Sequence, residues 1–180
     1  RSRDLTPLLP GRLRDLVALL LLQPAAKPLT REAIAAALWP ETVESQALTN
    51  VRNLLYKLRT AWPEAGDLLE ITRHQIQWKA QTQVWVDVHA FERGLAEAGR
   101  LGGGAAIHLL RTSVAQYAGD LLPGASDDWI LPLQERLREH YLAALGRLIN
   151  LLVDQHDLAG ALQAAQRLVA AAPLREEPYR

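Results

Sequence analysis

The sequence predicts a mainly α-helical protein in two parts, in which three helices and a pair of short strands precede an all-helical half. Apolar residues recur at helical spacing in three early segments, 11–22, 30–39 and 48–59. Two short segments with partly alternating apolar residues follow, and from Phe91 onward the pattern is helical throughout. The 180 residues are enough for one domain or two small ones, each with a sizeable core.

Composition and charge exclude several classes of protein. The chain has no cysteine, which excludes a disulfide framework and a thiolate metal site and fits a reducing compartment. Its longest apolar run, Leu16–Leu22, is far shorter than the ~20 residues of a membrane-spanning helix, so we expect a cytoplasmic protein without membrane contact. Residues 1–80 hold 11 basic against 8 acidic residues, and residues 81–180 hold 9 against 12. This asymmetry indicates two modules with different partners.

The first two predicted helices are bounded by prolines. The first covers 11–22 and places apolar residues on one face, at Leu13, Leu16, Val17 and Leu20. The prolines of 23–28 predict a loop. The second helix begins after Thr30, a good N-cap, and ends at Trp39 because Pro40 cannot continue it.

The third predicted helix, 48–59, has two different faces. Its apolar residues fall within a ~120° arc and are Leu48, Val51, Leu54, Leu55 and Leu58. The opposite face carries Thr49, Asn50, Arg52, Asn53, Tyr56 and Lys57. From Gln46 to Thr60 there is no acidic residue, although a solvated helix normally mixes both signs of charge. Such a face suits a DNA groove, since Arg and Asn bind base edges with two hydrogen bonds, and Thr, Tyr and Lys hold phosphates.

A strand pair is predicted directly after this helix. Segments 68–72 and 75–79 have the β-branched and aromatic content of strands, with Arg73 and His74 between them, and a further strand is predicted at 83–88. Helix, turn, helix and strand pair is the order of a winged helix-turn-helix, whose wing would carry Arg73 and His74 to a neighbouring groove or backbone. The alternative is that the polar helix face contacts a partner protein or only solvent.

The second half is predicted to be all helical. Helices are expected at 89–98 and 105–117, followed by a long helix to near Gln155. A last helix is expected to follow Asp157 as its N-cap and to stop at Pro173, and 99–104 is expected to be a flexible break. The last two helices have the residue spacing of a tetratricopeptide repeat at Leu145, Leu148, Leu152, Ala161, Ala165, Leu168 and Pro173. Asp127 and Asp128 precede the long helix, where acids favour the N-terminal dipole.

No catalytic or cofactor motif is predicted. The glycines at 102–104 are not followed by Lys-Ser or Lys-Thr, so they form no phosphate loop. The five histidines show no i, i+4 spacing, so no metal site is expected. No Ser-His-Asp set has a local signature, and we expect neither an enzyme nor a bound cofactor.

The order of several stretches resembles a known family. The stretches LTREAIAAALWPE, ALTNVRNLLYKLR, LLEITRHQIQWK and VWVDVHAFE resemble the OmpR-type winged-helix domain of Streptomyces antibiotic regulatory proteins. The later stretches YAGDLLPGASDDWI and ALQAAQRLVAAAPLREEPYR resemble the bacterial transcriptional activation domain that follows it in this family. The resemblance implies a winged helix-turn-helix domain at 1–86 and a truncated, tetratricopeptide-like activation domain at 87–180.

The resemblance also implies a site. Ala47–Arg59 would be the recognition helix in the major groove of double-stranded DNA, and the family's DNA contacts would fall on Thr49, Asn50, Arg52, Asn53, Tyr56, Lys57, Arg73 and His74. The loop Pro40–Glu44 would contact RNA polymerase, and a homodimer would bind direct repeats. The predicted function is a sequence-specific DNA-binding transcriptional regulator, an activator. The alternative is a protein-interaction module of a larger signalling regulator that does not bind DNA.

Overall fold

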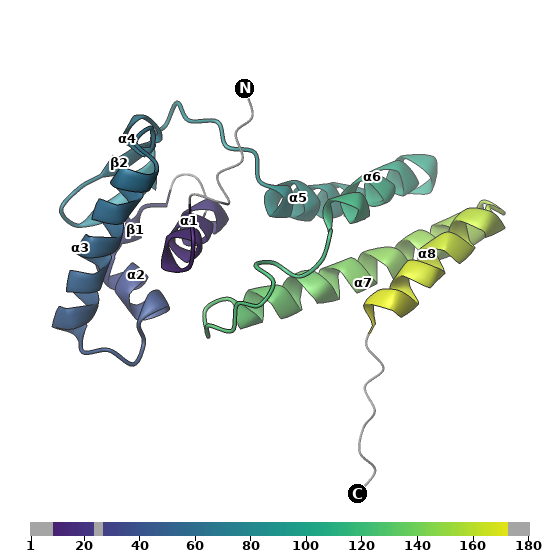
Figure 1. The fold of residues 1–180 in the computed structure, drawn as a ribbon. Coiled ribbons are helices and arrows are strands. Elements are labelled where there is room, and N and C mark those ends of the chain that lie inside the picture. The colour runs from purple at the N-terminus through teal and green to yellow at the C-terminus, as the bar shows by residue number, and fades with distance from the viewer. Residues whose placement is uncertain (1–8, 24–26, 173–180) are drawn as a thin grey trace, which may run out of the picture. The chain divides into compact units, whose positions relative to one another are not determined.

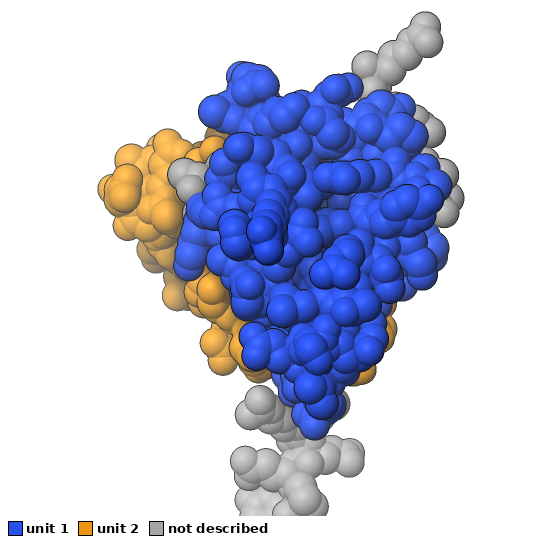
Figure 2. Space-filling model, turned by 90° about the vertical axis from the view of Figure 1, so that its left-hand side faces the viewer, with its two compact units in different colours: residues 1–84, 127–129 blue, residues 85–126, 130–180 orange. Residues whose placement is uncertain are grey.

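The computed structural model describes residues 9–23 and 27–172, which are mainly helical with a small antiparallel sheet (Figure 1). The chain divides into two compact units, coloured separately in Figure 2. Unit 1 comprises residues 1–84 with 127–129, and unit 2 comprises residues 85–126 with 130–180. Within the described ranges, none of the helices combines the length and the apolar character needed to span a bilayer.

Unit 1 combines three main helices with a three-stranded sheet. Its elements are α1 (Arg12–Leu22), β1 (Leu29–Thr30), α2 (Arg31–Leu38), α3 (Glu44–Ala61), α4 (Ala65–Leu68), β2 (Leu69–Ile71) and β3 (Gln75–Trp78). The strand order is β1-β3-β2, and both pairs are antiparallel. Thr30 pairs with Gln75, and Leu69 pairs with Trp78. The hairpin was predicted, whereas β1 was not, because a strand of two residues has no periodicity to detect.

The core of unit 1 lies between the three helices and the sheet. Its fully buried side chains include Leu16, Ile34, Leu38, Val51, Leu58 and Ile76. The indole Nε1 of Trp78 donates to the carbonyl of Leu20 at 2.9 Å, which joins the hairpin to α1. The predicted N-cap of α2 is confirmed, since Thr30 Oγ1 accepts from the Ala33 amide at 3.1 Å. Such a cap stabilises a helix by ~1 kcal/mol.

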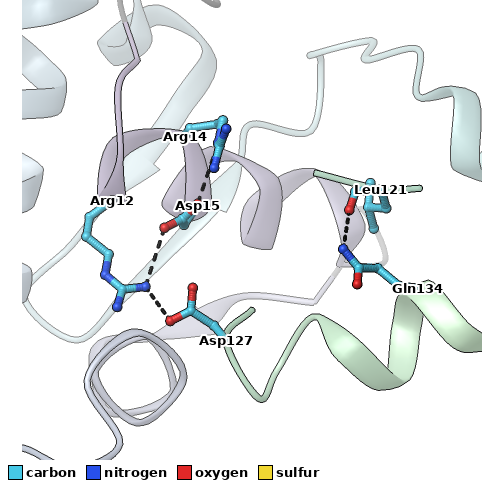
Figure 3. A network of polar contacts seen from close by, with 6 residues as sticks. All are labelled: Arg12, Arg14, Asp15, Leu121, Asp127 and Gln134. Atoms are coloured by element: carbon cyan, nitrogen blue, oxygen red, sulfur yellow. Dashed lines mark hydrogen bonds and ion pairs between the residues drawn. The ribbon is translucent and has the colours of Figure 1, made fainter. Parts of the chain in front are cut away.

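A short segment from late in the sequence also belongs to unit 1. Asp127 pairs with Arg12, which also contacts the nearly buried Asp15 (Figure 3). Trp129 packs against the core cluster of unit 1. The carboxylate of Asp127 is therefore bound to α1, and the following helix begins only at Leu131, which corrects the expectation that Asp127 serves a helix N-terminus.

The described part of unit 2 contains four helices. They are α5 (Asp87–Gly99), α6 (Gly103–Gln116), α7 (Leu131–Asp154) and α8 (Leu158–Ala171), and α5 packs on α6 and α7 on α8. Its core includes Phe91, Leu110, Leu137, Leu145, Leu152 and Ala161. Pro132 lies in the first turn of α7, where its missing N–H has no helical partner to lose. Asp157 caps α8, as predicted, by accepting from the Gly160 amide at 2.9 Å.

Several sequence-based boundaries need correction. The strand predicted at 83–88 is wrong: residues 83–86 form no strand and α5 begins at Asp87, because alternating residues form a strand only where another strand pairs with their backbone. Trp85 in this segment is 69% exposed. The break predicted at 99–104 is shorter, since α6 begins at Gly103. The loop residues 24–26 and the stop at Pro173 lie outside the described residues.

Candidate nucleic-acid interface

Helix α3 packs against the core through a continuous apolar stripe, and the residues at its two ends fix where it begins and ends. The buried side chains are Ala47, Val51, Leu54, Leu55 and Leu58, as the helical spacing predicted. The helix begins earlier than predicted, at Glu44, whose charge suits the positive end of the helix dipole. At the other end the Trp62 amide donates to the Leu58 carbonyl at 2.8 Å, and Pro63 follows. The 18-residue helix is therefore ~27 Å long.

The face of α3 opposite the core is open to solvent. Arg52, Asn53, Tyr56 and Lys57 are exposed, and the Tyr56 side chain is 73% exposed. Thr49 and Asn50 are half-buried. Among the described residues, the side chains of Arg52, Asn53 and Lys57 have no hydrogen-bond or ion-pair partner. Their polar groups are therefore free to bind something outside the unit.

Helical geometry divides this face into a centre and two flanks. At ~100° per residue, the positions pointing directly away from the buried stripe are Thr49, Asn53, Tyr56 and Thr60. Arg52 and Arg59 fall on one flank, seven residues apart, and Lys57 falls on the other. The two flanks are therefore positively charged, and the centre is neutral and polar.

The two asparagines of the face differ in their hydrogen bonding. Asn50 Oδ1 accepts from Gln46 Nε2 at 3.1 Å, so half of its amide is already engaged. Thr49 is engaged as well, since its hydroxyl donates to the Ser45 carbonyl at 2.9 Å. Asn53 keeps both its donor and its acceptor free within the described chain. It is the better placed of the two to pair with a base edge.

The turn between β2 and β3 exposes Arg73 and His74 together. The Thr72 hydroxyl organises this turn by accepting from the Gln75 amide at 3.1 Å and the His74 amide at 3.3 Å. Arg31, the first residue of α2, donates its backbone N–H to the His74 carbonyl at 3.0 Å. Sequence analysis did not single out Thr72 or Arg31. The preference of Thr for such turns was a usable signal for Thr72, whereas Arg31 lies too far away in the sequence to be recognised.

The loop between α2 and α3 borders a small groove. The groove has a volume of 310 Å³ and is lined by Glu32, Ala35, Ala36, Trp39, Pro40, Thr42, Glu44 and Ala47. Val43 in the same loop is 76% exposed, although it is apolar, and the exposed acids Glu41 and Glu44 lie on either side of it in the chain. This surface is acidic and apolar, unlike the basic face of α3.

The described residues form no group of three or more side chains that could hold a metal ion. The described chain is mainly helical, with an exposed, acid-free face on α3 in unit 1 and four helices in unit 2. Residues 86–180, which include the four helices of unit 2, match the family model of the bacterial transcriptional activator domain. The chain belongs to this family, which is a family of transcription regulators and not of enzymes. A comparison with curated proteins returned no match.

The family match confirms the second part of the resemblance noted in the sequence. It covers just over half of the chain and begins at Val86, directly before α5. The match does not extend over α1 to β3, so it does not indicate the role of unit 1.

Proposed function

We propose that the protein is a sequence-specific DNA-binding transcriptional regulator, an activator. Residues 1–86 would form an OmpR-type winged helix-turn-helix domain, with α3 as the recognition helix in the major groove. The observation that carries the proposal is the face of α3, which is exposed and contains no acid from Gln46 to Thr60. A negatively charged polymer would be attracted to such a face and repelled by a mixed or acidic one.

The exposed groups of α3 divide naturally into two roles. Asn53 and Arg52 carry the side-chain types that bind adenine and guanine edges with paired hydrogen bonds. Thr49, Asn50, Tyr56 and Lys57 would fix the register of the helix by contacts to phosphates and sugars, with Asn50 restricted by its bond to Gln46. A major groove ~12 Å wide accepts a helix of this kind along part of its length.

The arrangement of the remaining elements supports the same proposal. Helix α2, a short loop and α3 follow one another in the order of a helix-turn-helix, and the β2–β3 hairpin comes next. The exposed pair Arg73 and His74 at the hairpin tip would serve as the wing, against the minor groove or the backbone. The hairpin is fixed to the sheet through β1, so its tip has a defined position within unit 1.

We assign protein contacts to two further surfaces. The segment Pro40–Glu44, which joins α2 to the start of α3 and includes exposed Val43, would contact RNA polymerase, because an exposed apolar residue among acids suits a protein partner better than DNA. Residues 87–180 would act as a tetratricopeptide-like module for protein contacts or signalling, in keeping with the matched family. The protein would bind direct repeats in DNA as a homodimer.

In vitro selection of bound duplexes by the 180-residue chain tests this function. We expect a consensus with repeated half-sites, and mobility-shift affinities that fall steeply with salt because phosphate neutralisation releases counterions. Absence of retardation for every duplex at low salt would contradict DNA binding. That result would favour the alternative, a protein-interaction module of a larger signalling regulator.

A further inference from the structure

Within the described part of the chain, one residue outside the turn, Arg31, hydrogen-bonds to the tip of the β2–β3 hairpin. The guanidinium Nη2 of Arg31 donates to the Thr72 carbonyl at 2.8 Å, and its backbone N–H donates to the His74 carbonyl at 3.0 Å. Thr72 ends the β2 arm of the turn and His74 leads into the β3 arm. Arg31 therefore bridges both arms of the turn that carries Arg73.

The position of Arg31 follows from the sheet. Thr30 in β1 pairs with Gln75 in β3, and α2 begins at the next residue, Arg31. The start of α2 is thereby placed beside the hairpin tip, which lies 41 residues further along the chain. Because β1 leads directly into α2, any movement of the hairpin relative to this helix would break the bonds that Arg31 makes.

The Arg31 side chain faces the protein, unlike Arg73 and His74. Its Nε is buried without a hydrogen-bond partner, and the side chain as a whole is half-buried. Arg73 and His74 are exposed, and apart from Arg31 no other element of the described chain hydrogen-bonds to either of them. A guanidinium that donates to a backbone carbonyl in this way orients a turn, since a charged donor forms a stronger bond than a neutral one.

We propose that Arg31 is a positioning residue that presents the Arg73–His74 tip to DNA without contacting DNA itself, an inference that rests on the proposed function. Once the guanidinium is removed, the β2 arm of the turn keeps only the bonds within the turn, and the Arg31 backbone bond to the His74 carbonyl still holds the β3 arm. Arg73 would then sample several positions and lose part of its contact with the nucleic acid. Arg31 therefore affects DNA affinity only by positioning Arg73.

A double-mutant cycle on the selected duplex tests this dependence. The proteins are the unsubstituted chain, Arg31→Ala, Arg73→Ala and the double variant. We expect each single substitution to weaken binding roughly fivefold, as the loss of one hydrogen bond does, and the double variant to bind no more weakly than Arg73→Ala. Losses that multiply in the double variant would overturn the inference, because Arg31 would then act on DNA independently.

Lys27→Ala is the matched control for charge. Lys27 is exposed, lies just before β1 and has no partner among the described residues, so its removal takes one positive charge from unit 1 and leaves the contacts of the tip intact. Lys27→Ala should change DNA affinity by the same factor in the unsubstituted chain and in Arg73→Ala. Arg31→Lys retains the charge and one donor, and we expect it to restore part of the affinity lost in Arg31→Ala.

Amide hydrogen exchange on the free protein separates the inference from the proposed function. In Arg31→Ala, we expect faster exchange at His74 and Gln75 with little change in the core amides of α3. Unchanged exchange at these two amides would overturn the inference even if the chain binds DNA. If the unsubstituted chain retards no duplex, the proposed function fails, and the role of Arg31 in DNA presentation fails with it.

Discussion

The guanidinium of Arg12 donates to the carboxylate of Asp127 at 2.6 Å, joining two residues that are 115 positions apart in the chain (Figure 3). The same nitrogen, Nη1, lies 3.4 Å from Oδ2 of Asp15, a residue that is only 6% exposed. Among the described residues, Asp15 has one other cationic neighbour, Arg14, whose Nε lies 3.7 Å from its Oδ1. Arg12 therefore both neutralises a nearly buried carboxylate and holds the segment 127–129 in unit 1.

Arg12→Ala should lower the free energy of unfolding of unit 1 by ~2 kcal/mol, because it leaves Asp15 buried with Arg14 as its one cationic neighbour in the described part of the chain. This value already allows for the partial exposure of Arg12, which weakens its ion pairs. Urea unfolding followed by tryptophan fluorescence measures the effect, since four of the five tryptophans lie in unit 1.

Asp127→Ala is the companion substitution, and its cost should be smaller, roughly 0.5–1 kcal/mol. Asp127 is more exposed than Asp15, and Arg12 would keep Asp15 as a partner. A larger loss for Asp127→Ala than for Arg12→Ala would show that the segment 127–129, rather than the burial of Asp15, determines the energetics.

Substitutions on α3 should separate base reading from phosphate binding. Asn53→Ala or Arg52→Ala should cost ~1–3 kcal/mol on the selected duplex and blur the preference at one position. Lys57→Ala should weaken binding to all duplexes alike and reduce the slope of log affinity against log salt by ~1. Mobility-shift titrations on selected and scrambled duplexes at several salt concentrations provide both measurements.

Asn150→Ala on α7 is a control for these titrations, because Asn150 is an exposed asparagine that belongs to unit 2. We expect it to leave DNA affinity unchanged. Equal losses on selected and scrambled DNA for Arg52→Ala would remove its assigned role in base reading and place it with the phosphate contacts. The comparison of selected with scrambled DNA is informative for Arg52 because this residue lies on the same flank of α3 as Arg59, not at the centre of the face.

Gly94→Ala should destabilise unit 2. A methyl group at Gly94 of α5 would collide with the hydroxyl of Ser113 on α6 and would lie 3.3 Å from the Ser113 Cβ. Ser113 is 3% exposed and has little room to move, so we expect a cost of ~1–3 kcal/mol. Thermal unfolding followed by circular dichroism measures it.

Two further variants define the cause of this loss. Gly146→Ala on α7 should be neutral or stabilising by up to ~1 kcal/mol, because no atom lies within 4 Å of the added methyl group and alanine favours helices. Ser113→Ala removes the colliding oxygen and should restore part of the stability of Gly94→Ala. A Gly94→Ala protein as stable as Gly146→Ala would mean that α5 and α6 separate at little cost.

The Asp120–Arg138 pair should contribute to the pH dependence of unit 2. Arg138 Nη2 donates to both carboxylate oxygens, at 2.9 and 2.7 Å, and this bond lowers the pKa of Asp120, as does the Tyr117 hydroxyl. Because the folded-state pKa lies below the unfolded value, the stabilisation is complete above the unfolded pKa of ~4. It is lost as the pH falls through the folded-state pKa.

Asp120→Asn tests this sign. The variant should melt at a lower temperature than the unsubstituted chain near neutral pH, and the difference should shrink as the pH is lowered from about 6 to about 2. Both side chains of the pair are at least one-third exposed, so the difference should be small and should diminish with added salt. A difference that grows on acidification would contradict the assigned pKa direction.

The sequence by itself determined the main helices and the N-caps of two of them. Apolar residues at helical spacing located α1, α2 and α3 and identified which face of α3 is buried. This was possible because the helical repeat spans only a few residues and is therefore visible in a short stretch of sequence. The caps Thr30 and Asp157 were recognisable for the same reason, since each bonds to an amide three residues away. The exposed polar face of α3 also follows from local spacing, although its partner does not.

Only the tertiary structure decided which distant segments meet. The pairing of β1 with β3 makes Arg31 a neighbour of Thr72, and folding brings Asp127 to Arg12, at separations of 41 and 115 residues. The segment 83–86 looked like a strand but forms none, since a strand exists only where another backbone pairs with it. The spacing of apolar residues indicates which face of a helix or strand is apolar. The element that packs against this face depends on how the whole chain folds.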